Sequence, residues 1–333
     1  MLVAELLDKI RKTLLFATEY FSDAVSYFRY CGISPFQDPN RKLFYKILIE
    51  AHALEKGLSL AQPRPLFGVS KIRFLISALD RYDVSFSRLP GEMVCGIFHA
   101  YLDLHQSLGV SDPLLHDVSA FLTRYERTWD VTPNGGLRRM ERDDYDQIPD
   151  AARLITSRHS TRMFLPDHLR LEEVERVVHI AQSAPSQCNR QSAKAYFYQE
   201  RVDIDRLLRL QAGSAGFAQD VNNLFVITSE LAAWGGAQQR NQAYVDGALF
   251  AMNLMLACHA SGIASCPLNL AVTHKTGRAI CEAGAIGEGE RLIMMIAVGR
   301  PAPRDRLKIA RSPRRPLHEI LVTKLIGDHL EPR

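Results

Sequence analysis

The hydrophobic pattern of this chain of 333 residues changes once, close to residue 130. Up to that point, apolar residues recur at steps of three and four, which is the spacing of amphipathic helices. Breaks that contain Pro or Gly separate five such stretches, at residues 5–28, 41–58, 69–82, 92–109 and 113–127. The sequence therefore predicts an all-α region over residues 1–130.

Beyond residue 150, helical and strand-like stretches are mixed. The helical pattern returns at residues 150–157, 169–184 and 242–262, and one face of the second stretch collects Leu171, Val174, Val177, Val178 and Ala181. Runs rich in aromatic and β-branched residues predict strands at 193–200, 222–229 and 291–301. This mixture indicates an α/β or α+β fold. We expect a second domain over residues 150–333, joined to the first by a linker at 131–149 that begins with a Pro-Asn-Gly-Gly turn.

Composition excludes several classes of protein. The net charge of +4 is too small for a typical nucleic-acid binder. The most apolar stretch, 242–262, is interrupted and short for a membrane span, so we expect a buried central helix or a subunit interface. The first residues lack the order of a signal peptide. Six scattered cysteines without a CxxC pair predict free thiols, a cytoplasmic location and no metal site.

Two polar stretches could bind a ligand. The first, "SRHSTRMF", holds Arg158, His159, Ser160 and Arg162; guanidinium groups beside a hydroxyl suit a phosphate or carboxylate. The alternative is a solvated charged turn. The second stretch, "SAPSQCNRQS" at residues 183–192, follows a helix.

In this second stretch, Pro185 ends the helix and Ser186 can bond the freed backbone groups. Asn189 and Gln191 each offer a donor and an acceptor on a planar amide, which suits the edge of a heterocycle. A polar loop is the alternative. Cys188 has no recognisable base, so we interpret it as a packing thiol.

A third basic segment lies near the end of the chain. Residues 300–316 hold seven Arg or Lys and one Asp, and one or two of these arginines could bind phosphate; a solvated segment is the alternative. The glycines of 284–290 fit a turn rather than a dinucleotide fingerprint, because they precede a strand.

Taken in order, these stretches, the later "GIASCPLN" and "VGRP", and the basic "RRPLHEI" resemble the nitroreductase family of FMN-dependent oxidoreductases over residues 150–322. The resemblance implies an α+β fold, with a mainly antiparallel sheet wrapped by helices, and a homodimer with FMN at its interface. It assigns the phosphate and the pyrimidine edge to Arg158, His159, Ser160 and Arg162, and the flavin ring to Pro185, Ser186, Asn189 and Gln191. Backbone groups near the flavin N5 would come from Cys266, Pro267 and Leu268, although Pro267 has no N–H, and Arg314 and Arg315 would bind phosphate.

The implied activity is that of an enzyme whose chemistry is centred on the flavin, with no catalytic side chain. NADH or NADPH would reduce FMN and leave, and a small nitro, quinone or enone acceptor would then enter the same pocket. The alternatives are a specialised flavin enzyme (an azoline dehydrogenase, a dehalogenase or a flavin-fragmenting enzyme) and a non-enzymatic flavin-binding scaffold.

The chain departs from the family pattern at two places. Gln191 is followed by Ser192 where the family often has Pro and then Trp, which puts the usual acceptor range in question. Simple nitroreductases also lack the helical region over 1–130, which could restrict the substrate or dock a partner. In its most distinctive part, residues 52–68, a site could be lined by His52, Glu55, Lys56 and Arg64, or these could be solvated helix residues beside a turn.

Overall fold

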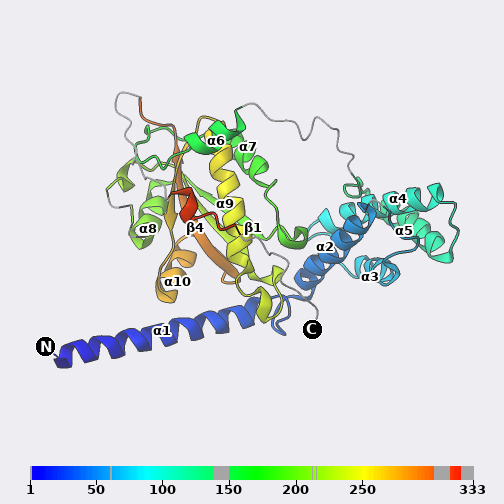
Figure 1. Cartoon of the computed structure of the whole chain (residues 1–333), viewed down its shortest axis with the longest axis horizontal. Coiled ribbons are helices and arrows are strands. Elements are labelled where there is room, and N and C mark those ends of the chain that lie inside the picture. The colour runs from blue at the N-terminus through cyan, green and yellow to red at the C-terminus, as the bar shows by residue number, and fades with distance from the viewer. Residues whose placement is uncertain are drawn as a thin grey trace, which may run out of the picture.

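The computed structural model describes residues 2–60, 62–137, 150–211, 213–214, 216–303 and 316–323. A long helix, α1 (Leu2–Tyr30), projects from an α+β body, and a cluster of helices lies on the other side of that body (Figure 1). The cluster contains α2 (Pro39–Leu58), α3 (Val69–Leu79), α4 (Leu89–Ser107) and α5 (Pro113–Trp129). All five predicted helices of the N-terminal region are confirmed.

Local sequence signals fix where these helices start. Asp38 and Asp112 each accept a backbone N–H of the first turn, and a proline follows each of them as the first helical residue. The four helices of the cluster enclose a core of their own. Its fully buried members include Ile47, Leu48, Leu54, Ile72, Leu75, Ile97, Phe98 and Tyr101.

Part of the segment expected as a linker packs against α4. Asn134 donates its N–H to the carbonyl of Glu92 at 2.9 Å. A Cβ on Gly135 would come within 2.5 Å of the Met93 carbonyl oxygen, so only glycine allows this close approach. Residues 138–149 lie outside the described residues.

The body is built on an antiparallel sheet of four strands, which confirms the α+β class. The strands are β1 (Ala193–Tyr198), β2 (Leu224–Glu230), β3 (Ala264–Asn269) and β4 (Glu290–Gly299), in the order β1-β2-β4-β3. The three predicted strands are confirmed. β3 was not predicted, because Pro267 argues against a strand; it is accommodated here because β3 lies at the sheet edge.

Helices cover both faces of the sheet. Phe225 and Ile227 of β2 pack on one face with α7 (Leu171–Ala181) and α9 (Gln242–Ala260), whereas Leu224 and Val226 point to the other. There they meet α8 (Arg201–Gln211) and α10 (His274–Ala283), which the sequence did not predict. The short helices are α6 (Ala151–Ser157), η2 (Gln187–Asn189), η3 (Ala218–Asp220), η4 (Leu231–Ala233), η5 (Ala237–Gln239) and η6 (Leu317–Glu319).

Two expectations about apolar faces need correction. Leu171 is 64% exposed, because it opens α7 before the helix reaches the sheet, so it does not share the buried face of Val174 and Val177. The segment Ala237–Ala260 is long and apolar enough to pass a length and composition test for a membrane span, although half of it is buried inside the protein. It includes α9, which packs on all four strands and is therefore the central helix of the fold.

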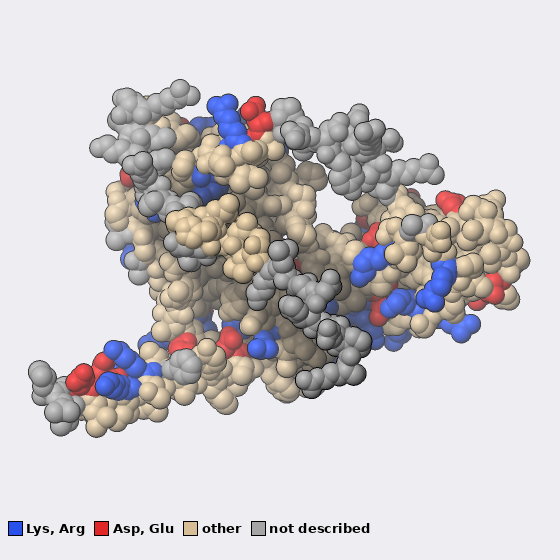
Figure 2. Space-filling model, viewed as in Figure 1, with Lys and Arg blue, Asp and Glu red and all other residues tan. Residues whose placement is uncertain are grey.

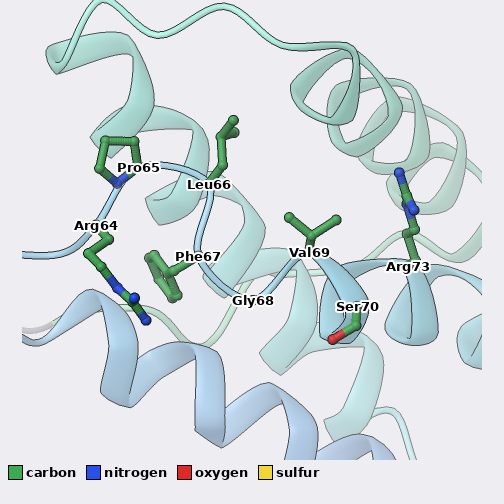
Figure 3. A pocket seen from close by; sticks show the side chains of 8 residues that line it. All are labelled: Arg64, Pro65, Leu66, Phe67, Gly68, Val69, Ser70 and Arg73. Carbon is green, nitrogen blue, oxygen red and sulfur yellow. The ribbon is translucent and has the colours of Figure 1, made fainter.

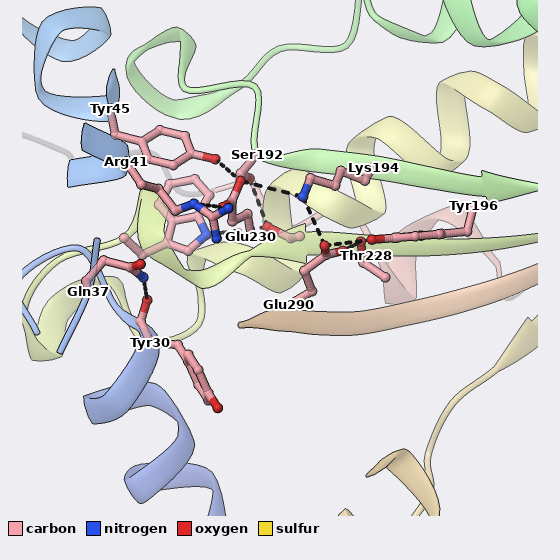
Figure 4. Close-up of polar contacts among 12 residues, drawn as sticks. Tyr30, Gln37, Arg41, Tyr45, Ser192, Lys194, Tyr196, Thr228, Glu230 and Glu290 are labelled. Carbon is pink, nitrogen blue, oxygen red and sulfur yellow. Dashed lines mark hydrogen bonds and ion pairs between the residues drawn. The ribbon is translucent and has the colours of Figure 1, made fainter. Parts of the chain in front are cut away.

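The N-terminal helices are joined to the sheet by polar contacts at the end of β2 (Figure 4). Tyr45 of α2 donates its hydroxyl to Glu230 Oε2 at 2.6 Å, and Arg41 Nε pairs with Glu230 Oε1 at 3.0 Å. Burial, followed by the charge of Glu230, raises the pKa of Tyr45 well above its usual range. Lys194 of β1 forms an ion pair with a second acidic side chain, with its Nζ at 2.9 Å from Glu290 Oε1. These contacts hold α2 directly against the end of β2.

Candidate functional site

The segment 158–162 runs beside the free edge of β3. Thr161 donates its N–H to the carbonyl of Ser265 at 2.9 Å, and Ser160 forms a bridge with the same residue. Arg158 is half-buried, and its buried Nη1 has no hydrogen-bond partner among the described residues; the same is true of the Ser265 hydroxyl. A buried polar group normally has a partner, so each of these two atoms is open to a bound ligand or a water molecule.

The surroundings of this segment are electropositive. His259, at the end of α9, has Nε2 at 2.8 Å from the Ser157 hydroxyl. Burial lowers the pKa of His259, and the positive charges of Arg158 and His159 lower it further. In the part of the chain that the structure describes, neither Arg158 nor Arg162 forms an ion pair with a carboxylate. The arrangement suits an anion supplied from outside.

The loop that contains Asn189 and Gln191 is strained. Cys188, Asn189 and Gln191 have φ values of 53°, 51° and 51°, in the left-handed backbone region that residues other than glycine rarely adopt. Such positions cost on the order of 1–3 kcal/mol each and concentrate at functional sites. Among the described residues, the side-chain amides of Asn189 and Gln191 have no hydrogen-bond partner in the protein. Both amides are therefore available to a ligand.

A buried carboxylate holds this loop in place. Asp246, the fifth residue of α9 and only 4% exposed, accepts the Ser186 hydroxyl at 2.6 Å and the Gln187 N–H at 3.0 Å. The Ser186 oxygen in turn accepts the N–H of Gln191 at 2.9 Å. Our sequence reasoning missed Asp246, although an acidic residue inside an almost wholly apolar helix was a usable signal.

Arg190 is a second residue that we missed. It is 5% exposed, lies 4.9 Å from the centre of the Trp234 ring, and donates to Gln187 Oε1 at 3.1 Å. Burial lowers the pKa of Arg190, while the charges of Cys188 and Asp246 act in the opposite direction. Arg190 therefore anchors the loop to Trp234 and to Gln187.

Pro185 and Ser192 occupy the two ends of the same loop. Pro185 is exposed, whereas Ser192 is buried and its hydroxyl bonds that of Ser229 at 2.8 Å. The serine that departs from the family pattern is thus an interior residue at the start of β1.

The register of β3 decides which backbone groups face outwards. Val298 donates its N–H to Asn223 towards β2, so the residues beside it in β4 face β3. Cys266 and Leu268 therefore use their N–H groups in the pairing with β4, and both side chains are buried. Pro267 faces the free edge without an N–H, and Asn269 is the next residue that turns the same way. This edge offers the N–H of Asn269 rather than those of Cys266 or Leu268.

The two groups of predicted residues lie at opposite ends of α9. Ser157 and the segment after it contact His259, whereas the loop at 185–191 is fixed by Asp246. A helix rises 1.5 Å per residue, so these contacts are about 20 Å apart. A single chain therefore contains two half-sites and does not bring them together. Arg314 and Arg315 lie outside the described residues.

A separate cavity of about 570 Å³ lies in the N-terminal cluster, where residues 64–68 lead into the first turns of α3 (Figure 3). Buried side chains pin this turn: Leu66 donates its N–H to His105 Nε2 and Tyr101 donates its hydroxyl to the Phe67 carbonyl, both at 2.9 Å. Arg64 and Arg73 are exposed at the cavity.

Of the other residues singled out in 52–68, His52 and Glu55 have structural partners, whereas Lys56 is exposed on α2 and no side-chain hydrogen bond or ion pair of it is found among the described residues. Glu55 accepts the N–H of Gly136 at 3.1 Å and lies 3.2 Å from His52 Nδ1. Gly57 leaves room for the Phe67 ring, since a Cβ there would come within 2.2 Å of it. The distinctive segment thus forms a packed turn. Of the four residues singled out in it, Arg64 is the one that lines the cavity described above.

Comparison with known families gives one match. Residues 155–235 match the sequence model of the nitroreductase family, which confirms the resemblance for this segment; the segment includes both polar stretches described above. No curated protein matches the chain.

Several solved structures are similar to part of the chain. A nitroreductase from Bacillus subtilis is 18% identical, with 54% of this chain and 100% of that one covered and a TM-score of 0.48. An NADH dehydrogenase/NAD(P)H nitroreductase from Bacteroides thetaiotaomicron is 16% identical, with 54% of this chain and 100% of that one covered and a TM-score of 0.46. A nitroreductase from Desulfovibrio desulfuricans in complex with FMN is 20% identical, with 55% of this chain and 100% of that one covered and a TM-score of 0.44.

Proposed function

We propose that this chain is an FMN-dependent oxidoreductase of the nitroreductase type, which transfers electrons from NADH or NADPH to a small nitro, quinone or enone acceptor in a ping-pong reaction. The observation that carries the proposal is the pair of half-sites. One is an arginine cluster without a counter-charge, the other a strained loop with two unpaired amides, and both lie within the segment that matches the family.

The arginine half-site fits the phosphate of FMN. A phosphate dianion needs several donors, and charge-assisted contacts from arginine are the strongest of these. Arg158 Nη1 and the Ser265 hydroxyl are buried and unpaired, so a bound phosphate oxygen would satisfy both. His159, Ser160 and Arg162 lie on the same short segment and would complete the donor set.

The amide half-site fits the edge of an isoalloxazine ring. Each side-chain amide presents a donor and an acceptor, which matches the alternating carbonyl and N–H groups of the pyrimidine edge. Asn189 and Gln191 would orient the ring, and Asp246 would keep them in position through Ser186. When bound, the flavin supplies the hydride chemistry, so no side chain of this protein needs to act as nucleophile or base.

A homodimer would bring the two half-sites together. Along α9, between its two ends, the exposed side chains Tyr244, Val245, Leu249 and Met252 form an apolar face. If two such faces pack with their helices antiparallel about a two-fold axis, the Asp246 end of one α9 lies beside the His259 end of the other. Each of two equivalent sites would then take its phosphate donors from one protomer and its amides from the partner.

We further propose a cytoplasmic location, because all six cysteines are free and suit a reducing compartment. The expected partners are a second copy of the chain and a small acceptor, with no role for nucleic acid or membrane.

A narrower substrate range is the second candidate. It is favoured by the packing of α2 against the loop turn η2, since the N-terminal helices then lie beside the amide half-site. Slow turnover of simple nitroaromatics and quinones beside normal FMN reduction would support a specialised flavin reaction. Flavin binding without any turnover would support a scaffold.

The deciding experiment is an absorption spectrum of the purified protein followed by anaerobic titration with NADH and with NADPH. We expect a yellow protein that bleaches with one or both and recovers when an acceptor is added. A protein that stays colourless when FMN is added would contradict the proposal. As a matched pair, Arg158→Ala should weaken FMN binding roughly 10- to 100-fold, since a charge-assisted contact contributes about 1.5–3 kcal/mol. Arg153→Ala, on the exposed side of α6, should leave FMN binding unchanged.

A further inference from the structure

Helix α1 touches its own chain through only part of its surface. Its 29 residues give a length of about 43 Å at 1.5 Å per residue. In its second half, Glu19 accepts the N–H of His274 at 2.6 Å, Asp23 pairs with Arg291, and Tyr27 donates to the Gly236 carbonyl at 2.9 Å. The first half extends beyond the body (Figure 1). Half of the helix is therefore held in place and half projects into solvent.

The apolar residues of α1 follow the spacing of a coiled-coil seam. Steps of three and four residues join Leu7, Ile10, Leu14, Ala17, Phe21, Ala24 and Phe28. The large members are exposed: Leu7 and Leu14 by 61% each, Ile10 by 47%, Phe21 by 72% and Phe28 by 59%. We call this set the α1 seam.

The α1 seam faces away from the body except at Phe21, which is exposed but also borders a pocket between α1 and α10. Successive residues of a helix are rotated by about 100°, so Glu19 and Asp23, which hold the body, lie almost opposite Phe21. The charged side chains gather along the edge of α1 that is nearer the body, and the other edge is free of them (Figure 2). A helix that packed on its own chain would show the opposite arrangement, with its apolar stripe buried.

We propose that the α1 seam packs against the α1 seam of a second copy of this chain, as an antiparallel helix pair. The exposed seam side chains amount to an area on the order of 700 Å² per helix, close to the ~800 Å² per partner of a stable interface. Within the described side chains, four Lys or Arg (Lys9, Arg11, Lys12, Arg29) balance four Asp or Glu (Glu5, Asp8, Glu19, Asp23). Such a neutral helix lacks the basic face that binds anionic lipid, and its spacing fits another helix.

Side-chain volumes favour the antiparallel direction. In a parallel pair each seam residue meets itself, which would stack Phe21 on Phe21 and leave gaps at Ala17 and Ala24. In an antiparallel pair centred between residues 15 and 16, Leu14 meets Ala17, Leu7 meets Ala24 and Ile10 meets Phe21. Each of these three layers then combines a larger with a smaller side chain, as close packing requires. The pairing does not depend on the flavin, so it can fail without affecting the function proposed above.

Cysteine cross-linking of the full chain tests the pairing. Leu14→Cys with Ala17→Cys should give a disulfide-linked dimer under mild oxidation, because these positions face each other across the pair. The matched control is Lys9→Cys with Lys12→Cys, which has the same spacing on the polar face and should cross-link no more than the wild type. Equal cross-linking of both variants, or none in either, would overturn the proposal.

A charge substitution gives an independent readout. Leu14 lies in the half of α1 that projects from the body, so Leu14→Glu should leave the fold intact, as circular dichroism would show. In sedimentation velocity, Leu14→Glu should weaken the association that runs through α1 at least tenfold and leave any dimer held by α9 in place, whereas Lys12→Glu should change neither. Pairing with a second copy would be refuted if Leu14→Glu associated like the wild type. It would also be refuted if the wild type bound phospholipid vesicles and Leu14→Glu lost that binding without any change in mass.

Discussion

Asp246 offers the sharpest test of how the amide half-site is maintained. Its carboxylate accepts the Ser186 hydroxyl, the Gln187 N–H and the Gln242 side-chain amide, the last at 2.9 Å. Asp246→Ala removes both acceptor oxygens and with them all three hydrogen bonds. Hydrogen bonds to a charged group contribute about 1.5–3 kcal/mol each, and these are partly accessible to water, so we expect a stability loss of about 2–4 kcal/mol.

The same substitution should weaken FMN binding. Three residues of the loop occupy the left-handed region at about 1–3 kcal/mol each, and without Asp246 the loop can relax to unstrained backbone. Asn189 and Gln191 would then lose their orientation. We expect FMN affinity to fall roughly 10- to 100-fold, which corresponds to about 1.4–2.8 kcal/mol.

Flavin fluorescence quenching and urea unfolding would measure the two effects separately. Gln242→Ala is the matched control, because it removes one partner of Asp246 and leaves the contacts to Ser186 and Gln187 intact. The losses of stability and of FMN affinity in Asp246→Asn should lie between those of Asp246→Ala and Gln242→Ala, since the Asn amide keeps one acceptor oxygen. If Asp246→Ala lost stability as expected but bound FMN like the wild type, loop geometry would not determine flavin binding, and the assignment of this half-site would be wrong.

Three further predictions concern the rest of the fold. Hydrogen bonds from Arg300 and from the backbone of Arg170 lower the pKa of Glu173 to about 2, so its contribution to stability is present above its usual pKa and is lost as the pH falls towards 2. Glu173→Gln should thus cost about 1–3 kcal/mol in urea unfolding at pH 7 and progressively less between pH 4.5 and pH 2. Tyr45→Phe should cost about 1–3 kcal/mol of unfolding free energy, because Glu230 loses a buried donor. Cys188→Ser should keep steady-state turnover within about twofold, since flavin-centred chemistry needs no thiol; loss of turnover would make Cys188 a reacting group.

The sequence predicts best where one physical signal dominates. The helices of the N-terminal region follow from apolar periodicity and from the Asp-Pro starts, and β2 and β4 follow from continuous apolar runs. Not every element was predicted: α8 and α10 were missed although both are amphipathic helices, and β3 was missed because its signals conflict. β3 contains Pro267, which is unfavourable inside a sheet and tolerated at its edge, and edge position is a property of the whole topology.

The candidate site shows a different limit. The residue types at 158–162 and 185–191 indicate anion binding and heterocycle binding, and both indications remain compatible with the structure. Their separation along α9 could not be predicted, because Ser186 and Asp246 are 60 positions apart and meet only through tertiary packing. The same holds for β3, where the register alone turns Asn269 outwards and Cys266 inwards.

The N-terminal helices share a boundary with the amide half-site, and this bears on why the chain carries them. α2 packs against η2, whose residues include Cys188 and Asn189, and Tyr45 ties the same helix to Glu230 at the end of β2. The strained loop is therefore held from two sides, by Asp246 of α9 and by α2. If α2 only tethered a separate module, its contacts would stop at Glu230 at the end of β2. Because they reach the loop, a change in the N-terminal helices acts on the residues proposed to orient the flavin, whereas the arginine half-site, at the other end of α9, should remain unaffected.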